Sequence, residues 1–126
     1  MNKGNLNVSI TNLTGETIFH VSFLHNYKND AYNAGKTLQI EPGETIGIGE
    51  VTFWTHEPED RANYWWVQFE HFDTYYASIL GEFNCELDKN DIESGGAVSV
   101  KVTLDTMTVI PPVSETRTTK IMATKR

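Results

Sequence analysis

Hydrophobic and polar residues alternate with a period of two along most of the chain, and the central example is Tyr64–His71. Successive side chains of a β-strand point to opposite faces of the sheet. One face of this stretch is apolar, made of Trp65, Val67 and Phe69. The other face is mixed, made of Tyr64, Trp66, Gln68 and Glu70. The pattern predicts a central strand with Trp65 in the core and Trp66 on the outside.

The same alternation predicts eight further strands, at residues 6–10, 17–25, 38–40, 45–54, 75–80, 82–88, 97–105 and 107–110. In the second of these, we expect Phe19, Val21 and Phe23 to face the core. In residues 45–54 the apolar positions switch from even to odd at residues 47–49, where two glycines flank Ile48. This switch predicts a β-bulge, with an irregular strand end as the alternative.

Polar segments rich in Asn, Asp, Gly and Pro separate these strands. Residues 25–37 and 55–63 are predicted loops, and residues 89–96 form a polar loop with room for one helical turn. Short strands with frequent turn signals are typical of a sandwich. The sequence therefore predicts an all-β protein: a single antiparallel β-sandwich of about nine short strands over residues 1–112. Residues 113–126 lack apolar alternation, and we expect them to form a flexible basic tail.

Charge narrows the classes of partner. The 126 residues carry a net charge of −7, which fits a single acidic domain. Residues 111–126 hold four basic residues and one acidic residue, so the rest of the chain is more acidic still. A nucleic-acid-binding protein would need a basic surface, so we expect no nucleic acid partner. Docking on anionic lipid by charge alone is also disfavoured.

The single cysteine, Cys85, excludes an intrachain disulfide. It alternates with Phe83 and Leu87, which predicts an inert core position. The first residues lack the apolar region of a signal peptide, and no apolar run approaches the length of a membrane span. These features predict a cytoplasmic protein, with export by a route that needs no signal peptide as the alternative.

No motif for catalysis, metal or cofactor binding stands out in the sequence. The chain lacks a P-loop, a dinucleotide-binding glycine pattern and a Gly-x-Ser-x-Gly elbow. Its four histidines have no metal-binding spacing on a helix. We therefore expect no cofactor, no metal and no enzymatic activity. A hydrolase whose site is assembled from residues distant in the sequence is the alternative.

Aromatic residues are the strongest candidates for a binding site. Tyrosine and tryptophan are favoured where one end of the ring is apolar and the other is wet, as at a protein interface, a sugar platform or a lipid headgroup boundary. The candidate residues lie on the outer face of the central strand and in the polar segment that begins at residue 25: Tyr64, Trp66, Tyr27, Tyr32, His25 and Asn26. The alternative is that a neighbouring loop simply covers these rings.

Three blocks of sequence carry a resemblance to a known family. They are Phe53-Trp54 with its charged loop, Tyr64-Trp65-Trp66-Val67, and Phe83–Leu87 leading through Asp91 and Gly95-Gly96 to Met107-Thr108-Val109. In order and spacing, these blocks resemble a small family named for nematode proteins that are up-regulated when insulin signalling is lost, also found in fungi. That family is similar to the aegerolysins, which are small acidic β-sandwiches. The resemblance covers roughly residues 5–112.

The resemblance also implies a function. Aegerolysins bind sphingolipid-rich membranes and serve as the targeting partner of a separate pore-forming protein, whereas the nematode proteins are partners of one another. We therefore expect a non-enzymatic binding module for a membrane lipid headgroup or a partner protein, with a homo- or heterodimer as one form. A role as the targeting half of a two-component pore-forming system is implied in the same way. A carbohydrate-binding module that uses the same aromatic residues is the alternative.

Overall fold

The computed structural model describes residues 2–27, 31–55 and 62–125. These residues form ten strands: β1 (Asn2–Asn12), β2 (Ile18–Tyr27), β3 (Ala31–Ile40), β4 (Thr45–Thr55), β5 (Tyr64–His71), β6 (Thr74–Ala77), β7 (Val98–Val102), β8 (Thr106–Ile110), β9 (Arg117–Lys120) and β10 (Met122–Lys125). One short helix, α1 (Lys89–Glu93), precedes β7. The predicted all-β sandwich is confirmed.

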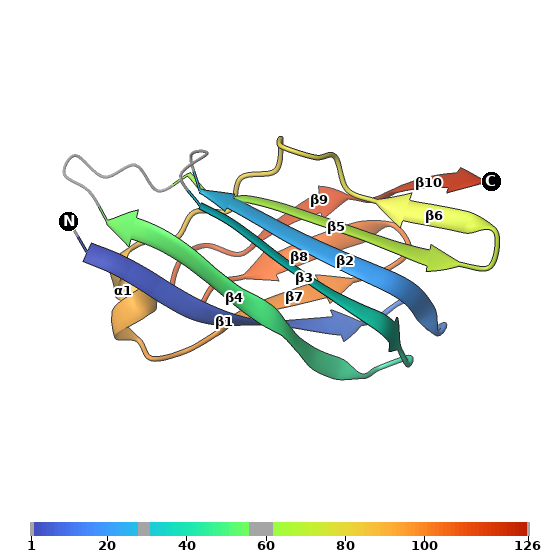
Figure 1. Ribbon diagram of the computed structural model, residues 1–126, viewed down its shortest axis with the longest axis horizontal. Coiled ribbons are helices and arrows are strands. Elements are labelled where there is room, and N and C mark those ends of the chain that lie inside the picture. The colour runs from blue at the N-terminus through green and yellow to red at the C-terminus, as the bar shows by residue number, and fades with distance from the viewer. Residues whose placement is uncertain (1, 28–30, 56–61, 126) are drawn as a thin grey trace.

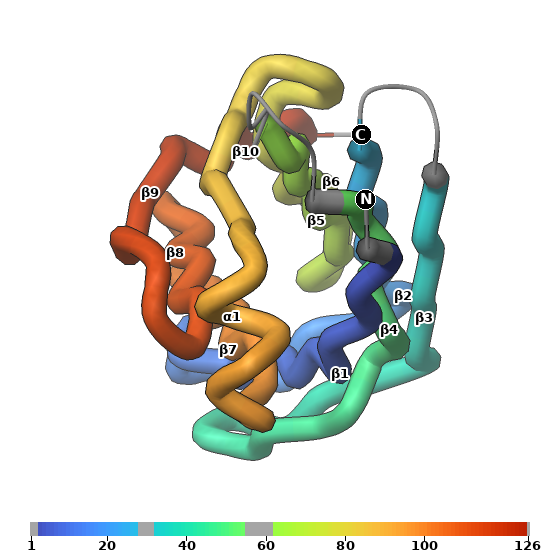
Figure 2. Tube along the Cα trace, turned by 90° about the vertical axis from the view of Figure 1, so that its left-hand side faces the viewer, coloured from blue at the N-terminus to red at the C-terminus, as the bar shows by residue number. Residues whose placement is uncertain are grey.

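The strands form two five-stranded sheets (Figure 1). The first sheet has the order β4-β1-β7-β8-β9, and the second has the order β10-β6-β5-β2-β3. Seen from one end, the two sheets form two layers around the space that the core side chains fill (Figure 2). Pairing is antiparallel except between β1 and β7, which run parallel within the described part of the chain. The sandwich is therefore mixed at one position rather than purely antiparallel.

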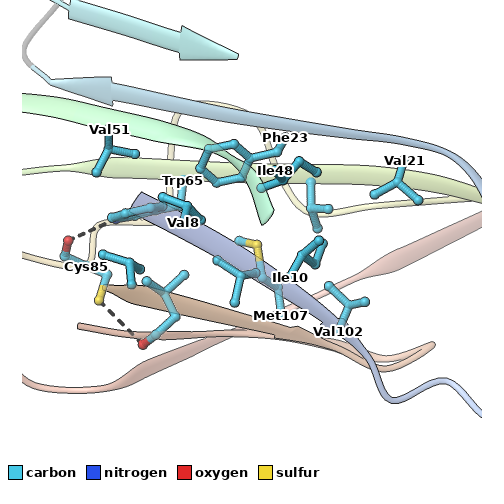
Figure 3. Close-up of a cluster of buried hydrophobic side chains, with 14 of the residues drawn as sticks. Val8, Ile10, Val21, Phe23, Ile48, Val51, Trp65, Cys85, Val102 and Met107 are labelled. Carbon is cyan, nitrogen blue, oxygen red and sulfur yellow. Dashed lines mark hydrogen bonds between the residues drawn. The ribbon is translucent and has the colours of Figure 1, made fainter. Parts of the chain in front are cut away.

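The core lies between the sheets and contains the predicted inward face of β5. Trp65, Val67 and Phe69 are all buried, as expected. The indole Nε1–H of Trp65 donates a hydrogen bond to the backbone oxygen of Cys85 at 2.9 Å (Figure 3). Cys85 itself is buried, and burial raises the pKa of its thiol to about 12, against an opposing effect of Arg117. The expectation of an inert core cysteine fits this environment.

The predicted β-bulge in residues 45–54 is confirmed. Val8 of β1 pairs with Gly49 of β4, but the next residue, Ser9, pairs with Gly47. Ile48 is therefore the extra residue, and its side chain turns into the core. Gly49 has a φ of +152°, a backbone conformation that favours glycine. The bulge explains why the inward positions change from even to odd along this strand.

The predicted facing of Phe19 is wrong. His20 has a positive φ of 48°, and the pairing of β2 with β5 is irregular between Phe19 and Ser22. This irregularity changes which side chains point inward, so Ile18 and Val21 are buried while Phe19 is exposed. Sequence alternation assumes an unbroken strand, and a single irregular residue reverses the facing on one side of it.

Two further segment predictions also need correction. Residues 82–88 are not a strand, although Asn84 forms an isolated bridge with Tyr64, and Phe83 is only partly buried. The predicted loop at residues 25–37 is largely sheet, because β2 continues to Tyr27 and β3 starts at Ala31. Residues 28–30 of that loop, and residues 56–61 of the predicted loop at 55–63, lie outside the described residues.

The prediction of a flexible tail at residues 113–126 is wrong. β9 pairs with β8 in the first sheet, and β10 pairs with β6 in the second, so both strands belong to the sandwich. Ile121 lies between these two strands and is buried. Its backbone N–H donates a hydrogen bond to the backbone oxygen of Asp105. β9 and β10 are short edge strands with largely exposed side chains, which is why they show no apolar alternation.

Hydrogen bonds to the Asp91 side chain connect the start of this C-terminal segment to α1. Its carboxylate is buried and accepts hydrogen bonds from the backbone N–H groups of Val113 and Ser114, both at 2.9 Å, and from the Ser114 hydroxyl. It also accepts the backbone N–H of Asp88 at 2.9 Å, which completes the N-terminal cap of the helix. One buried side chain therefore joins the helix to the chain that leads into β9.

Candidate functional site

The principal candidate site is a cavity of about 150 Å³ on the outer face of the second sheet. It is lined by Leu24, Asn26, Tyr32, Tyr64, Trp65, Trp66, Leu80 and Gly81. Four of the six residues singled out from the sequence are in this set: Asn26, Tyr32, Tyr64 and Trp66. They come from three neighbouring strands, β3, β2 and β5, so the sheet itself holds them in place.

Strand register fixes the order of the rings. Asn26 of β2 is paired with Tyr32 of β3 on one side and with Tyr64 of β5 on the other. The amide side chain therefore lies between two tyrosines in a row that crosses three strands. The next outward row brings Leu24 directly beside Trp66. Together these two rows make a largely apolar wall with one polar group in it.

Apolar side chains also project at the edge of the cavity. Tyr32 is 61% exposed, and Leu80 is 62% exposed. Ile79, the neighbour of Leu80, is exposed as well. A monomeric protein rarely leaves adjoining large apolar groups in water, and such patches mark interaction sites.

Sequence reasoning missed the contribution of two segments to the cavity. Leu24 could have been found, because it shares the outward positions of β2 with Asn26 once the strand is known to continue to Tyr27. Leu80 was predicted to end a strand at residues 75–80, but β6 ends at Ala77, so Leu80 and Gly81 lie in a segment outside any strand. Their place beside the rings depends on the path of the chain.

Two other candidate residues lie in the interior and not in the cavity lining. Tyr27 is fully buried between the rings of Phe53 and Trp54, and its hydroxyl donates to the Trp54 backbone oxygen at 2.8 Å. His25 is also fully buried, against the ring of Trp65. Both were expected in an exposed loop. The continuation of β2 places these odd positions on the core face, so neither side chain can contact an external ligand directly.

His25 connects the strands that carry the two tyrosines. Its Nδ1 lies 3.0 Å from Oδ1 of Asn33, and its Nε2 lies 2.6 Å from Oδ1 of Asn63. Asn33 follows Tyr32 in β3, and Asn63 immediately precedes Tyr64. Burial lowers the pKa of His25, while the hydrogen bonds to Asn63 and Asn33 act in the opposite direction. Folding therefore favours the neutral ring.

Acid should weaken the fold through His25. Because the folded state holds the pKa below the ordinary 6.5, the unfolded chain binds more protons as pH falls below that value. The free energy of unfolding should therefore fall by up to about 1.4 kcal/mol per pH unit below pH 6.5. Urea unfolding at pH 7.5, 6.5 and 5.5 measures this slope, in a range where most carboxylates stay ionised.

Two variants isolate the contribution of His25 to this slope. His25→Gln cannot titrate and should lose most of the acid dependence, whatever its stability at pH 7.5. His20→Gln is the matched control, because it removes an exposed histidine of the same strand and leaves the buried ring of His25 in place. An equal slope in the wild type and His25→Gln would contradict the assignment.

A second cavity, of about 370 Å³, is polar and lies where the C-terminal segment passes residues 86–88. It is lined by Glu86, Asp88, Val113, Ser114, Glu115 and Arg117. Ser114 donates its hydroxyl to Asp91, but that carboxylate already accepts three backbone N–H groups. The Ser114 hydroxyl is therefore one of four donors to a buried carboxylate, in a contact that joins the C-terminal segment to α1. Among the described residues, no group of three His, Cys, Asp or Glu side chains could hold a metal ion.

The outer face of the first sheet is chemically different. One row crosses all five of its strands and consists of Thr45, Thr11, Lys101, Thr108 and Thr118. Adjacent threonines in this row hydrogen-bond to each other, as Thr11 does to Thr45 at 2.6 Å and Thr108 to Thr118 at 2.9 Å. The aromatic cavity therefore belongs to the second sheet, opposite a face of hydroxyl groups.

No protein-family model matches the chain, and no curated protein matches its sequence. None of the helical structure in the described residues is long and apolar enough to cross a lipid bilayer.

Proposed function

We propose that the protein is a binding module that receives a zwitterionic lipid headgroup in the cavity formed by Tyr32, Tyr64 and Trp66. The observation that carries this proposal is the convergence of these three rings, from two strands of one sheet, on a single small cavity. The faces of aromatic rings attract quaternary ammonium groups, and cages of such rings are a recurrent way to bind them.

Size and charge support the same class of ligand. A cavity of about 150 Å³ is the size known to hold one benzene molecule, so it suits a compact headgroup and not a whole lipid. The chain has a net charge of −7, which opposes an anionic membrane surface. A compact headgroup with a cationic end and no net charge fits the small cavity and is not repelled by the acidic protein.

The edge of the cavity supports contact with a membrane surface. Tyr32 and Leu80 are mostly exposed beside the cavity, with Ile79 next to Leu80. Amphipathic tyrosines and apolar side chains suit the boundary between headgroups and acyl chains. The resemblance to aegerolysins agrees with a lipid ligand and extends the proposal to a targeting role beside a separate pore-forming protein.

Vesicle pelleting tests the proposal. Unilamellar vesicles of phosphatidylcholine and sphingomyelin should sediment the wild-type protein, whereas phosphatidylserine vesicles should sediment much less. Trp66→Ala removes one wall of the cavity and should weaken binding at least about fivefold, the equivalent of one cation–π contact of about 1 kcal/mol. Tyr75→Ala is the matched control, because Tyr75 is an aromatic residue of the same sheet outside the cavity lining. A wild type that stays in the supernatant with every vesicle would refute the lipid ligand.

A carbohydrate is the second candidate, and Asn26 favours it. The Asn26 amide lies between Tyr32 and Tyr64, so a sugar ring stacked on either tyrosine would meet a polar side chain. A glycan array with the same two variants separates the candidates. Binding to a glycan that Trp66→Ala abolishes and Tyr75→Ala preserves, without any vesicle binding, would assign the cavity to sugars.

A further inference from the structure

We propose that His25 is the positioning residue of the aromatic cavity, because its ring nitrogens tether the residues beside Tyr32 and Tyr64, and that protonation of this ring weakens ligand binding. This inference rests on the proposed function, since it concerns regulation of the same cavity. His25 does not line the cavity. Its effect must therefore pass through the strands that carry the tyrosines.

The tether spans all three strands of the site. His25 belongs to β2, where its neighbours Leu24 and Asn26 point outward and line the cavity. Its two ring nitrogens reach the side chains of Asn33 in β3 and of Asn63, the residue immediately before β5. The buried imidazole therefore sits beneath the cavity and, in addition to the backbone pairing, links β2 to β3 and to the residue that precedes β5.

Both tethered asparagines are held from a second side. The Oδ1 atom of Asn33 also accepts the backbone N–H of Thr52 in β4 at 2.9 Å. The backbone N–H of Asn63 donates to Oδ1 of Asn84 at 2.9 Å, and its backbone oxygen accepts the N–H of Cys85. Neither asparagine is therefore free to move alone. A change in the hydrogen bonds of His25 must also affect the strands to which the asparagines are bonded.

The two protonation states of His25 make different demands on these partners. A backbone N–H can only donate, so the Asn33 atom that faces Nδ1 is an acceptor and Nδ1 must carry a proton. In the protonated ring, Nε2 also carries a proton and donates it to the Asn63 oxygen. In the neutral ring, Nε2 has no proton and must accept from the NH₂ group of the Asn63 amide. Each change of protonation therefore requires the Asn63 amide to turn, next to Tyr64.

Ligand binding favours one of these states. The side chains that face the ring in the described structure are Asn33 from β3, Asn63 and, from β5, Trp65, and none of them titrates or carries charge. A charged imidazole therefore has no counter-ion among these side chains. Trp65 both lines the cavity and contacts His25, so the charge would lie close to the cationic end of the proposed headgroup and repel it. Ligand and proton should oppose each other, and the effect is reciprocal.

Binding as a function of pH tests the proposal. The probe is phosphatidylcholine–sphingomyelin vesicles, whose headgroup charge is constant between pH 5.5 and 7.5. Wild-type affinity should fall as the protonated fraction of His25 rises, by at least about twofold at pH 5.5, because only the neutral fraction binds well. His25→Gln should bind with no pH dependence, because its amide can keep one tether without titrating. His20→Gln, which removes an exposed histidine of the same strand, is the matched control. Equal pH dependence in His25→Gln and the wild type would overturn the proposal.

Hydrogen exchange without any ligand tests the tether separately. The backbone N–H groups of Asn63 and Trp65 donate to Asn84 and Phe83. Their protection factors should fall selectively in His25→Phe, which keeps a ring against Trp65 but removes both hydrogen bonds. They should also fall in the wild type at pH 5.5. Unchanged protection in both cases would overturn the proposal. If vesicles fail to bind the wild type while protection falls as expected, the lipid ligand is refuted and the tether stands.

Discussion

Replacement of Trp65 by alanine is expected to lower the free energy of unfolding by about 3–5 kcal/mol. The side chain is 1% exposed and packs against the rings of Phe23 and His25. Its indole also donates to the backbone oxygen of Cys85, which would lose this buried donor. Urea unfolding followed by far-ultraviolet circular dichroism measures the change without relying on tryptophan fluorescence.

Trp66→Ala is the matched control for this prediction, because it removes the same side chain one position along the same strand. Trp66 is only partly buried and lies on the outer face of β5, so its loss should cost far less stability. Its main effect should appear in vesicle binding. A larger loss of stability in Trp66→Ala than in Trp65→Ala would show that the two faces of β5 are exchanged.

Removal of residues 113–126 is expected to lower the melting temperature by at least about 10 °C, or to prevent folding. The truncation deletes the edge strand of each sheet, β9 and β10, together with buried Ile121. It also removes Val113 and Ser114, which supply three of the hydrogen-bond donors of buried Asp91. An ionised carboxylate left in the interior without donors is strongly destabilising.

Two further variants separate the causes of this loss. Ile121→Ala should cost about 2–4 kcal/mol, as expected for a buried aliphatic side chain. The double change of Lys120 and Lys125 to glutamine should alter stability by less than about 0.5 kcal/mol, because both side chains are exposed. If the full truncation melts within about 2 °C of the wild type, the last two strands contribute nothing to the fold.

Much of the candidate site was predictable because the alternation of side chains along a strand places its residues on one face. Alternation along Tyr64–His71 assigns Tyr64 and Trp66 to the outside, and the structure places them there. The same rule applied to residues 25–27 would have placed His25 and Tyr27 inside. Asn and Asp near these residues indicated a loop, and that local signal was misleading. Backbone pairing outweighs the loop propensity of single residues when a strand has neighbours on both sides, as β2 has β3 and β5.

The sequence by itself determined the sandwich class, the buried face of β5 and the bulge at Ile48, because each depends on the local period of two and on glycine. Only the tertiary structure decided three other features. It introduced the irregularity of β2 at His20, added β9 and β10 as edge strands, and brought Leu80 into the lining of the aromatic cavity. Each of these depends on backbone pairing or chain path between distant residues. Backbone hydrogen bonds are common to all sequences, so such pairings leave little trace in side-chain patterns.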